Sequence, residues 1–79
     1  MFRILVVEDD KNTRLLMKAV LEAEHYTVVT AENGQDALEV MDREHIDLVV
    51  LDIMMPKMDG YEFTRLLREN QSNLPILTE

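Results

Sequence analysis

Acidic residues stand directly after two short apolar runs of this chain. Glu8, Asp9 and Asp10 follow the run ILVV at residues 4–7, and Asp52 follows the run LVVL at residues 48–51. Such runs, rich in β-branched residues, are typical of parallel strands buried on both faces. Open parallel sheets bind ligands in the crevice outside the carboxyl ends of their strands. If the two strands are neighbours, the carboxylates meet in one crevice.

A cluster of carboxylates is costly because like charges repel, unless a cation lies among them. Mg²⁺ fits, since it takes oxygen ligands and is typically held by one or two carboxylates plus a phosphate. A carboxylate can itself act as the nucleophile of phosphoryl transfer, and Asp52 is the natural choice. Taken singly, Asp52 also fits a simple turn aspartate, and Asp9 fits an acid at a helix N-terminus. The joint arrangement favours a site.

The elements that must position these acids follow from the apolar spacing. Strands are expected at residues 3–7, 27–31, 47–52 and from about 74–77, and helices at 12–24, 35–44 and 60–70. Asp10 or Asn12 is expected to cap the first helix. The apolar stripe of that helix consists of Leu15, Leu16, Ala19, Val20 and Ala23, and the second helix is expected to turn Ala37, Leu38 and Met41 inward. Alternating strands and helices predict an α/β fold with a parallel sheet.

The amino-acid composition limits the classes of function that this chain can have. The chain has 79 residues, enough for one small domain, with 47% hydrophobic and 30% charged residues and a net charge of −8. An acidic chain is a poor candidate for nucleic-acid binding, which depends on Lys and Arg. No apolar run reaches the ~18–20 residues of a membrane span, and the start does not resemble a signal peptide. The chain has no cysteine, which fits a cytoplasmic location.

Three separated motifs, ILVVEDD, LVVLD and DIMMPKMDG, together resemble the receiver domain of bacterial two-component response regulators. The resemblance runs from Phe2 to about Ile76. It implies a flavodoxin-like, doubly wound parallel sheet. The sheet is expected to be incomplete, because the chain stops in or just after the fourth strand, so residues 1–79 are expected to be the N-terminal part of a receiver domain.

The resemblance also implies roles for single residues. Asp52 would accept a phosphoryl group from a sensor histidine kinase, with Mg²⁺ as the cofactor. Asp9 would bind the Mg²⁺ directly, Glu8 through water, and Met54 through its backbone carbonyl. In the family, a lysine at the end of the fifth strand pairs with the phosphoryl group, and this lysine is absent here. Thr78 receives no role. His25 is expected to be structural and His45 to be a surface loop residue, and neither is expected to donate a phosphoryl group or to bind a metal.

Other functions are weighed against the same residues. A haloacid-dehalogenase-like phosphatase needs a second Asp two positions after the nucleophile, where this chain has Met54. A nucleotide-binding protein needs a glycine-rich loop, and the chain has two glycines in all. The chain is therefore expected to be a signalling module and not an enzyme. The alternative is a fragment without phosphotransfer activity that acts as a folding or assembly unit.

An incomplete sheet has a physical consequence. One of its apolar faces lacks a covering helix, and its fourth strand is an exposed edge. The 79-residue chain is therefore expected to be unstable as a monomer. It should self-associate, by exchange of elements for example, or take the missing segment from another polypeptide.

Overall fold

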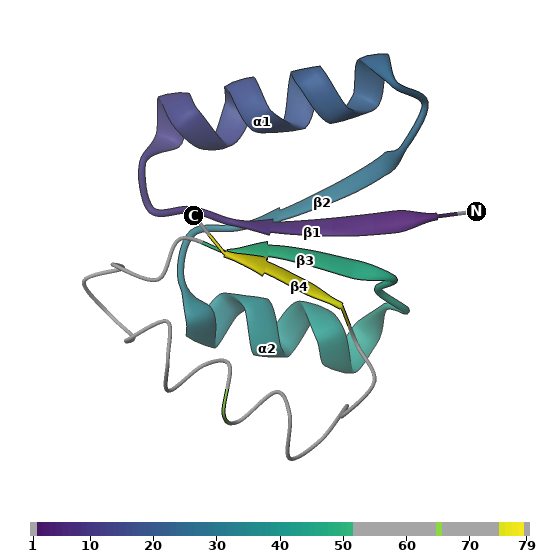
Figure 1. Ribbon diagram of the computed structural model, residues 1–79. Coiled ribbons are helices and arrows are strands. Elements are labelled where there is room, and N and C mark those ends of the chain that lie inside the picture. Colours follow the sequence, from purple (N-terminus) through teal and green to yellow (C-terminus); the bar gives the residue numbers. More distant parts are fainter. Residues whose placement is uncertain (1, 52–64, 66–74, 79) are drawn as a thin grey trace.

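Four parallel strands form one sheet in the order β2-β1-β3-β4 (Figure 1). The computed structural model describes residues 2–51, 65 and 75–78. Its elements are β1 (Arg3–Val7), α1 (Lys11–Ala23), β2 (Thr27–Ala31), α2 (Gly34–Arg43), β3 (Leu48–Leu51) and β4 (Ile76–Thr78). The α/β fold class is confirmed. The helix expected at residues 60–70 falls outside the described residues, apart from Arg65, which has helical backbone.

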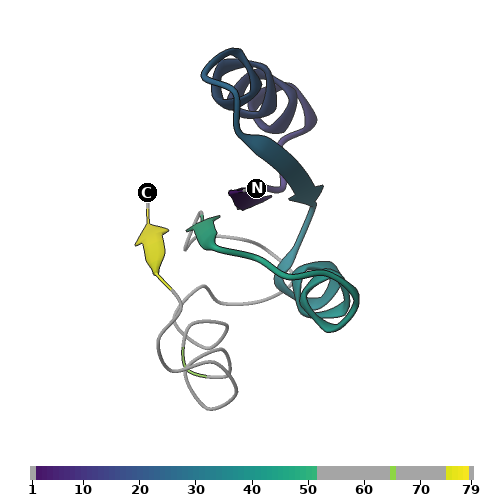
Figure 2. The ribbon, with the colours of Figure 1, turned by 90° about the vertical axis from the view of Figure 1, so that its right-hand side faces the viewer.

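β1 is buried on both faces, as its sequence predicts. Leu5 and Val7 belong to a core cluster with α2, and Ile4 and Val6 belong to a second cluster beneath α1. All four side chains are at most 2% exposed. Figure 2 shows why, since α1 and α2 lie on opposite sides of the sheet. The central strand therefore needs apolar residues at every position, without the alternation of a half-exposed strand.

α1 begins at Lys11, one residue before the expected start, because Asp10 caps it. The Asp10 carboxylate accepts a hydrogen bond from the backbone N–H of Thr13. The helix is followed by His25, whose φ of 71° lies in the left-handed region. That conformation lets the chain leave the helix, and it confirms the structural role expected for His25.

The apolar stripe of α1 is not in the core. Leu15, Leu16 and Val20 are 52%, 64% and 56% exposed, and no residue of this fully described helix is buried. Met17 and Leu21, one helical turn apart, are the side chains that pack against the sheet. The physical reason is that α1 packs against β1 and β2. The apolar stripe points away from these two strands, and no other described element packs against it.

α2 covers the opposite face. It begins at Gly34, one residue earlier than expected, because the Asn33 side chain accepts a hydrogen bond of 2.9 Å from the backbone N–H of Asp36. Ala37 and Met41 are buried as predicted, and Leu38 is half-buried. Val40 is also buried, which the sequence interpretation missed.

β3 begins at Leu48 and not at the expected residue 47. Asp47 serves as a link between strands instead: its backbone N–H donates to the carbonyl of Arg3 at 2.9 Å, and its carboxylate accepts from the N–H of Arg3 at 2.8 Å. His45 Nε2 lies 2.7 Å from the other carboxylate oxygen of Asp47. The hydrogen bond from Arg3, followed by that of His45, holds the pKa of Asp47 below its ordinary value. His45 is 77% exposed, as expected for a surface loop residue, and its contact with Asp47 was not predicted.

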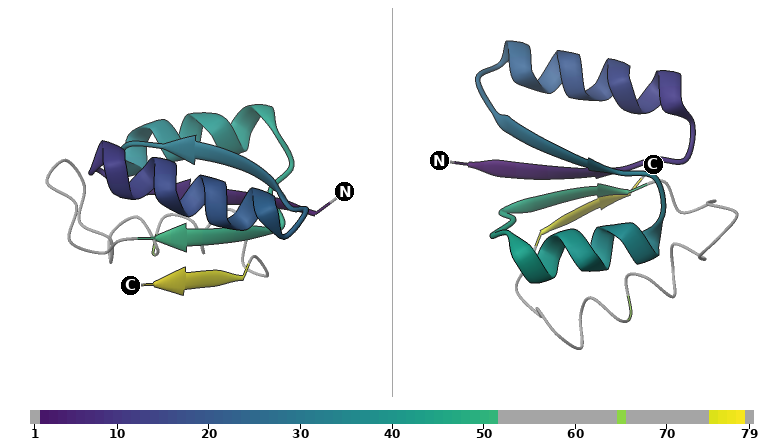
Figure 3. Two further views of the ribbon diagram at one scale, coloured as in Figure 1. Left: turned by 90° about the horizontal axis from the view of Figure 1, so that it is seen from above. Right: turned by 180° about the vertical axis from the view of Figure 1, so that it is seen from behind.

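The surface beside α1 is open and apolar. β4 is the edge strand, and Leu77, paired in register with Val50, is 57% exposed. Seen from above, β4 lies beyond the cover of α1 (Figure 3, left). A hollow of about 310 Å³ is lined by Leu16, Met17, Val20, Leu21 and Val50. We call these residues with Leu77 the open apolar face. Among residues 2–51, 65 and 75–78, no element covers this face or pairs with the outer edge of β4, in agreement with the sequence prediction.

Candidate functional site at the carboxyl ends of β1 and β3

The acids after β1 form a turn that is anchored to the sheet. The backbone N–H of Glu8 donates to the carbonyl of Ala31 at 3.1 Å, which extends the pairing of β1 with β2 by one residue. Glu8 is 5% exposed, whereas Asp9 is exposed. The turn therefore places one carboxylate inside the edge of the sheet and the next one toward solvent. We call residues 8–10 the acidic turn.

Asp10 has a structural role in this turn. Its carboxylate accepts from the Thr13 backbone N–H at 2.8 Å and from the Thr13 hydroxyl at 2.7 Å. The hydroxyl bond, followed by the backbone bond, lowers the pKa of Asp10 from its ordinary value. The Asp10 N–H also lies 3.4 Å from Glu8 Oε2. Capping thus occupies Asp10, which leaves Glu8 and Asp9 as the acids of the turn that can hold a ligand.

Arg14 contacts the acidic turn, which the sequence did not predict. Its Nη1 donates a hydrogen bond of 2.9 Å to the backbone carbonyl of Glu8. Arg14 lies one helical turn after the cap residue, and its backbone N–H donates to the Asp10 carbonyl at 2.9 Å, so its side chain can reach back over the acidic turn. That position is the signal that could have identified it.

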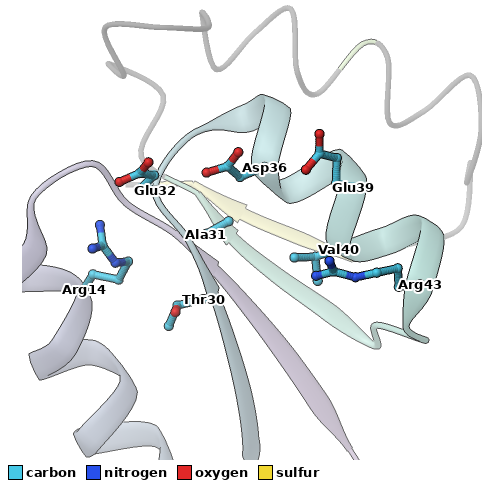
Figure 4. Close-up of a pocket in the computed structure, with 8 residues that line it drawn as sticks. All are labelled: Arg14, Thr30, Ala31, Glu32, Asp36, Glu39, Val40 and Arg43. Atoms are coloured by element: carbon cyan, nitrogen blue, oxygen red, sulfur yellow. The ribbon is translucent and has the colours of Figure 1, made fainter.

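Arg14 also lines a polar hollow of about 340 Å³. Figure 4 shows Arg14 of α1 reaching toward Glu32, which follows β2, with Asp36 and Glu39 of α2 along the same hollow. Its other lining residues are Thr30, Ala31, Val40 and Arg43. Neither Glu8 nor Asp9 lines it, so this hollow is a neighbour of the acidic turn and not the predicted crevice.

The two strands that precede the predicted acids, β1 and β3, lie side by side in the sheet. The strands are parallel neighbours, and Val7 is in register with Leu51. The next residues in the sequence are Glu8 and Asp52. The condition on which the sequence argument depended, that the two acid-bearing strands are neighbours, is therefore met. Asp52 and Met54 themselves lie outside the described residues.

The donors of the acidic turn fit a hard divalent cation, since they are carboxylate oxygens at the carboxyl edge of a parallel sheet. Among residues 2–51, 65 and 75–78, no three His, Cys, Asp or Glu side chains form a group that could hold a metal ion. The turn therefore offers part of a ligand set. His45 lies next to Asp47 and Arg3, at the opposite ends of β1 and β3, so it is not one of the missing ligands. No helix among the described residues is long and apolar enough to cross a membrane.

Comparison with known proteins agrees with this arrangement. The sequence pattern of the family described as "Response regulator receiver domain" matches residues 4–78. The alkaline phosphatase synthesis transcriptional regulatory protein PhoP of Bacillus subtilis is 43% identical over 75 residues, which cover 95% of this chain and 31% of PhoP. The chain thus spans about a third of the length of the curated relatives it matches first.

Solved structures give the same result. The response regulator TrrA of Thermotoga maritima in complex with Mg²⁺-BeF superposes with a TM-score of 0.92 at 44% identity, covering 99% of this chain and 70% of TrrA. TrrA in complex with the histidine kinase ThkA gives a TM-score of 0.92 at 42% identity, covering 99% of this chain and 67% of that one. With the sheet order, the position of the acidic turn and these matches together, the chain belongs to the family of response regulator receiver domains.

Proposed function

We propose that this chain is a phosphoacceptor module of a two-component system, in which Asp52 receives a phosphoryl group from the phosphohistidine of a sensor histidine kinase. The observation that carries the proposal is the parallel pairing of β1 with β3, in which Val7 is in register with Leu51. Asp52 follows Leu51 directly in the sequence. This pairing supports the proposal, because the acidic turn follows β1 and the proposed acceptor is the next residue of the sequence after β3.

The chemistry is a transfer between two nucleophiles. A carboxylate oxygen of Asp52 forms a bond to phosphorus, the P–N bond of the phosphohistidine breaks, and the released imidazole nitrogen is protonated from solvent. Asp9 is the direct ligand of Mg²⁺, Glu8 acts through water, and Met54 contributes its backbone carbonyl. Bound Mg²⁺ supplies neutralisation of the phosphoryl oxygens. The complexes of TrrA with Mg²⁺-BeF and with ThkA support this assignment by analogy.

The module serves signalling and is not a catalyst of metabolite turnover. Residues 1–79 represent the N-terminal part of a receiver domain, which matches 67% to 70% of the length of the TrrA chains. With its net charge of −8, this segment does not bind nucleic acid. It acts in the cytoplasm, where the kinase's phosphohistidine is presented.

Phosphorylation by a small donor tests the proposal. The chain is incubated with acetyl phosphate and Mg²⁺, and intact mass is measured. The expected result is a gain of one phosphoryl group that disappears in Asp52→Asn and on removal of Mg²⁺ by a chelator. Asp36→Asn is the matched control, since Asp36 is a half-exposed carboxylate at the start of α2; its mass gain should equal that of the unchanged chain. Equal labelling of Asp52→Asn contradicts the proposal, and absence of any labelling favours the alternative of an assembly unit.

A second proposal concerns the association of the chain with other polypeptides. The open apolar face carries Leu16, Val20 and Leu77, each more than half exposed, beside the hollow between α1 and Val50. Contiguous apolar surfaces of this kind mark association sites. We propose that the 79-residue chain self-associates through this face, or takes up a segment of another polypeptide there.

Light scattering over a range of concentrations tests self-association. The unchanged chain should form dimers or larger species at micromolar concentration, and Leu16→Glu should shift it toward the monomer because a charge enters the apolar face. Leu15→Glu is a matched control at a neighbouring exposed leucine that does not line the hollow, and it should have the smaller effect. A well-folded monomer of the unchanged chain at micromolar concentration contradicts the proposal.

A further inference from the structure

Hydrogen bonds on both sides of Asp9 anchor the acidic turn. Glu8 is fixed through its N–H, which donates to the Ala31 carbonyl at 3.1 Å, and through its carbonyl, which accepts from Arg14 at 2.9 Å. Asp10 is fixed by its carboxylate, which accepts from Thr13 at 2.8 Å and 2.7 Å. Asp9 stands between these two anchored residues, so the direction of its exposed side chain depends on both anchors.

The anchor at the Glu8 carbonyl comes from the side chain of Arg14 in α1. That carbonyl belongs to the same planar peptide unit as the N–H of Asp9. Fixing the carbonyl therefore fixes the orientation of the bond that leads into Asp9. A hydrogen bond from a guanidinium is charge-assisted and stronger than one between neutral groups. Arg14 also lies in regular helix, so its own backbone is rigid.

We propose that Arg14 is a positioning residue for the divalent cation, which holds the Glu8–Asp9 peptide so that the Asp9 carboxylate is directed correctly before the cation arrives. This inference rests on the proposed function, because it assumes that Asp9 and Glu8 hold Mg²⁺. It assigns Arg14 no contact with the cation or the phosphoryl group. Its action passes through the backbone of the acidic turn.

The two physical effects of Arg14 on a cation have opposite signs. As a positive charge beside the acidic turn, it repels the cation, and its removal should strengthen binding. As an anchor of the turn, it reduces the freedom that the ligands lose on binding, and its removal should weaken binding. Groups that orient metal ligands typically change metal affinity by about 10–100-fold when they are removed. We therefore expect the positioning effect to exceed the repulsion.

The test measures Mg²⁺ binding to the unphosphorylated chain by isothermal titration calorimetry, a readout independent of phosphotransfer. Arg14→Ala is expected to bind Mg²⁺ about tenfold more weakly. Arg14→Lys keeps the charge but loses the planar fork, and it should recover part of the affinity. Lys11→Ala is the matched control, since Lys11 is an exposed cation at the first position of α1. Its removal should leave binding unchanged or slightly stronger.

Each outcome is decisive. Unchanged or stronger binding by Arg14→Ala, parallel to Lys11→Ala, overturns the positioning role while the proposed function stands. Absence of Mg²⁺ binding by the unchanged chain, or binding that survives Asp9→Asn, overturns the proposed function itself and the inference with it. Far-UV circular dichroism checks that the variants are folded. If Arg14→Ala is not, Arg14→Lys decides, because weaker binding by a folded chain of equal charge supports positioning and equal binding contradicts it.

Discussion

Val49 and Val50 are neighbours in β3 that face opposite sides of the sheet, and they offer a matched pair for testing the fold. Val49 is 0% exposed in the core cluster with α2. Val50 is half-buried and lines the hollow of the open apolar face. The same substitution at the two positions therefore removes the same atoms from a closed core and from an open surface.

Val49→Ala should cost about 2.5–3 kcal/mol of the free energy of unfolding. The loss of two methylene equivalents contributes about 1.6 kcal/mol at about 0.8 kcal/mol each. A cavity of about 40–50 Å³ adds about 1–1.2 kcal/mol at about 24 cal/mol per Å³. Val50→Ala leaves no closed cavity and removes groups that are partly exposed already, so it should cost less than about 1 kcal/mol.

Urea unfolding followed by far-UV circular dichroism measures both values. A chain of this size has a total stability of about 4–12 kcal/mol, so the loss at Val49 is a large fraction of it. The melting temperature of Val49→Ala should fall by about 10–24 °C, at about 4–8 °C per kcal/mol. The measurements are repeated at two protein concentrations, because self-association stabilises the folded chain by mass action.

The comparison can refute the assignment of faces. Equal losses for the two variants at low concentration, or a larger loss for Val50→Ala, would show that β3 does not alternate between a closed core and an open face. A cost of Val50→Ala that appears only at high concentration has a different meaning. It indicates that a second copy covers the open apolar face, and it leaves the assignment intact.

Other substitutions test single contacts, and urea unfolding measures each of them. Asn33→Ala should lose about 0.5–2 kcal/mol by removing the cap of α2, whereas Asn33→Asp should keep most of the stability; equal losses would contradict the cap. His25→Gly should raise the free energy of unfolding by about 1 kcal/mol, because glycine adopts a positive φ without strain, and His25→Val should lower it. A lower stability of His25→Gly would contradict the left-handed conformation. Asp47 has a pKa below its ordinary value of 3.8 in the folded chain, so its stabilisation is complete above that value and is lost as the pH falls through the lowered pKa. Asp47→Asn should therefore show less loss of stability on acidification than the unchanged chain, and an identical pH dependence would refute this.

Some features of the fold could be predicted from the sequence because they depend on local or pairwise rules. The run ILVV is buried on both faces as the central strand β1, as its sequence predicts. The run LVVL was expected to be buried in the same way, but in β3 only Val49 and Leu51 are buried, because Val50 lines the open apolar face. Asp10 was one of two predicted caps, and the Thr13 bonds select it. The position of Glu8 and Asp9 at the carboxyl edge of the sheet followed from the sequence once parallel strands were assumed, since the carboxyl ends of parallel strands share one edge.

Other features required the tertiary structure. The stripe of Leu16 and Val20 is apolar at helical spacing, yet both residues are exposed, because burial depends on what lies above a helix and not on its periodicity. Arg14 carries no motif that marks it as an anchor of the acidic turn. Its role arises when α1 folds back over the end of β1 and its guanidinium meets the Glu8 carbonyl.

The sequence by itself therefore determined the strand and helix order, the family and the acids that are candidates for chemistry. The tertiary structure decided that β1 and β3 are neighbours in register, that Asp10 is occupied in capping, and which apolar side chains remain uncovered. The physical reason is the distance along the chain over which each interaction acts. Propensity and capping act over a few adjacent residues, whereas register and burial depend on contacts between segments that are distant along the chain.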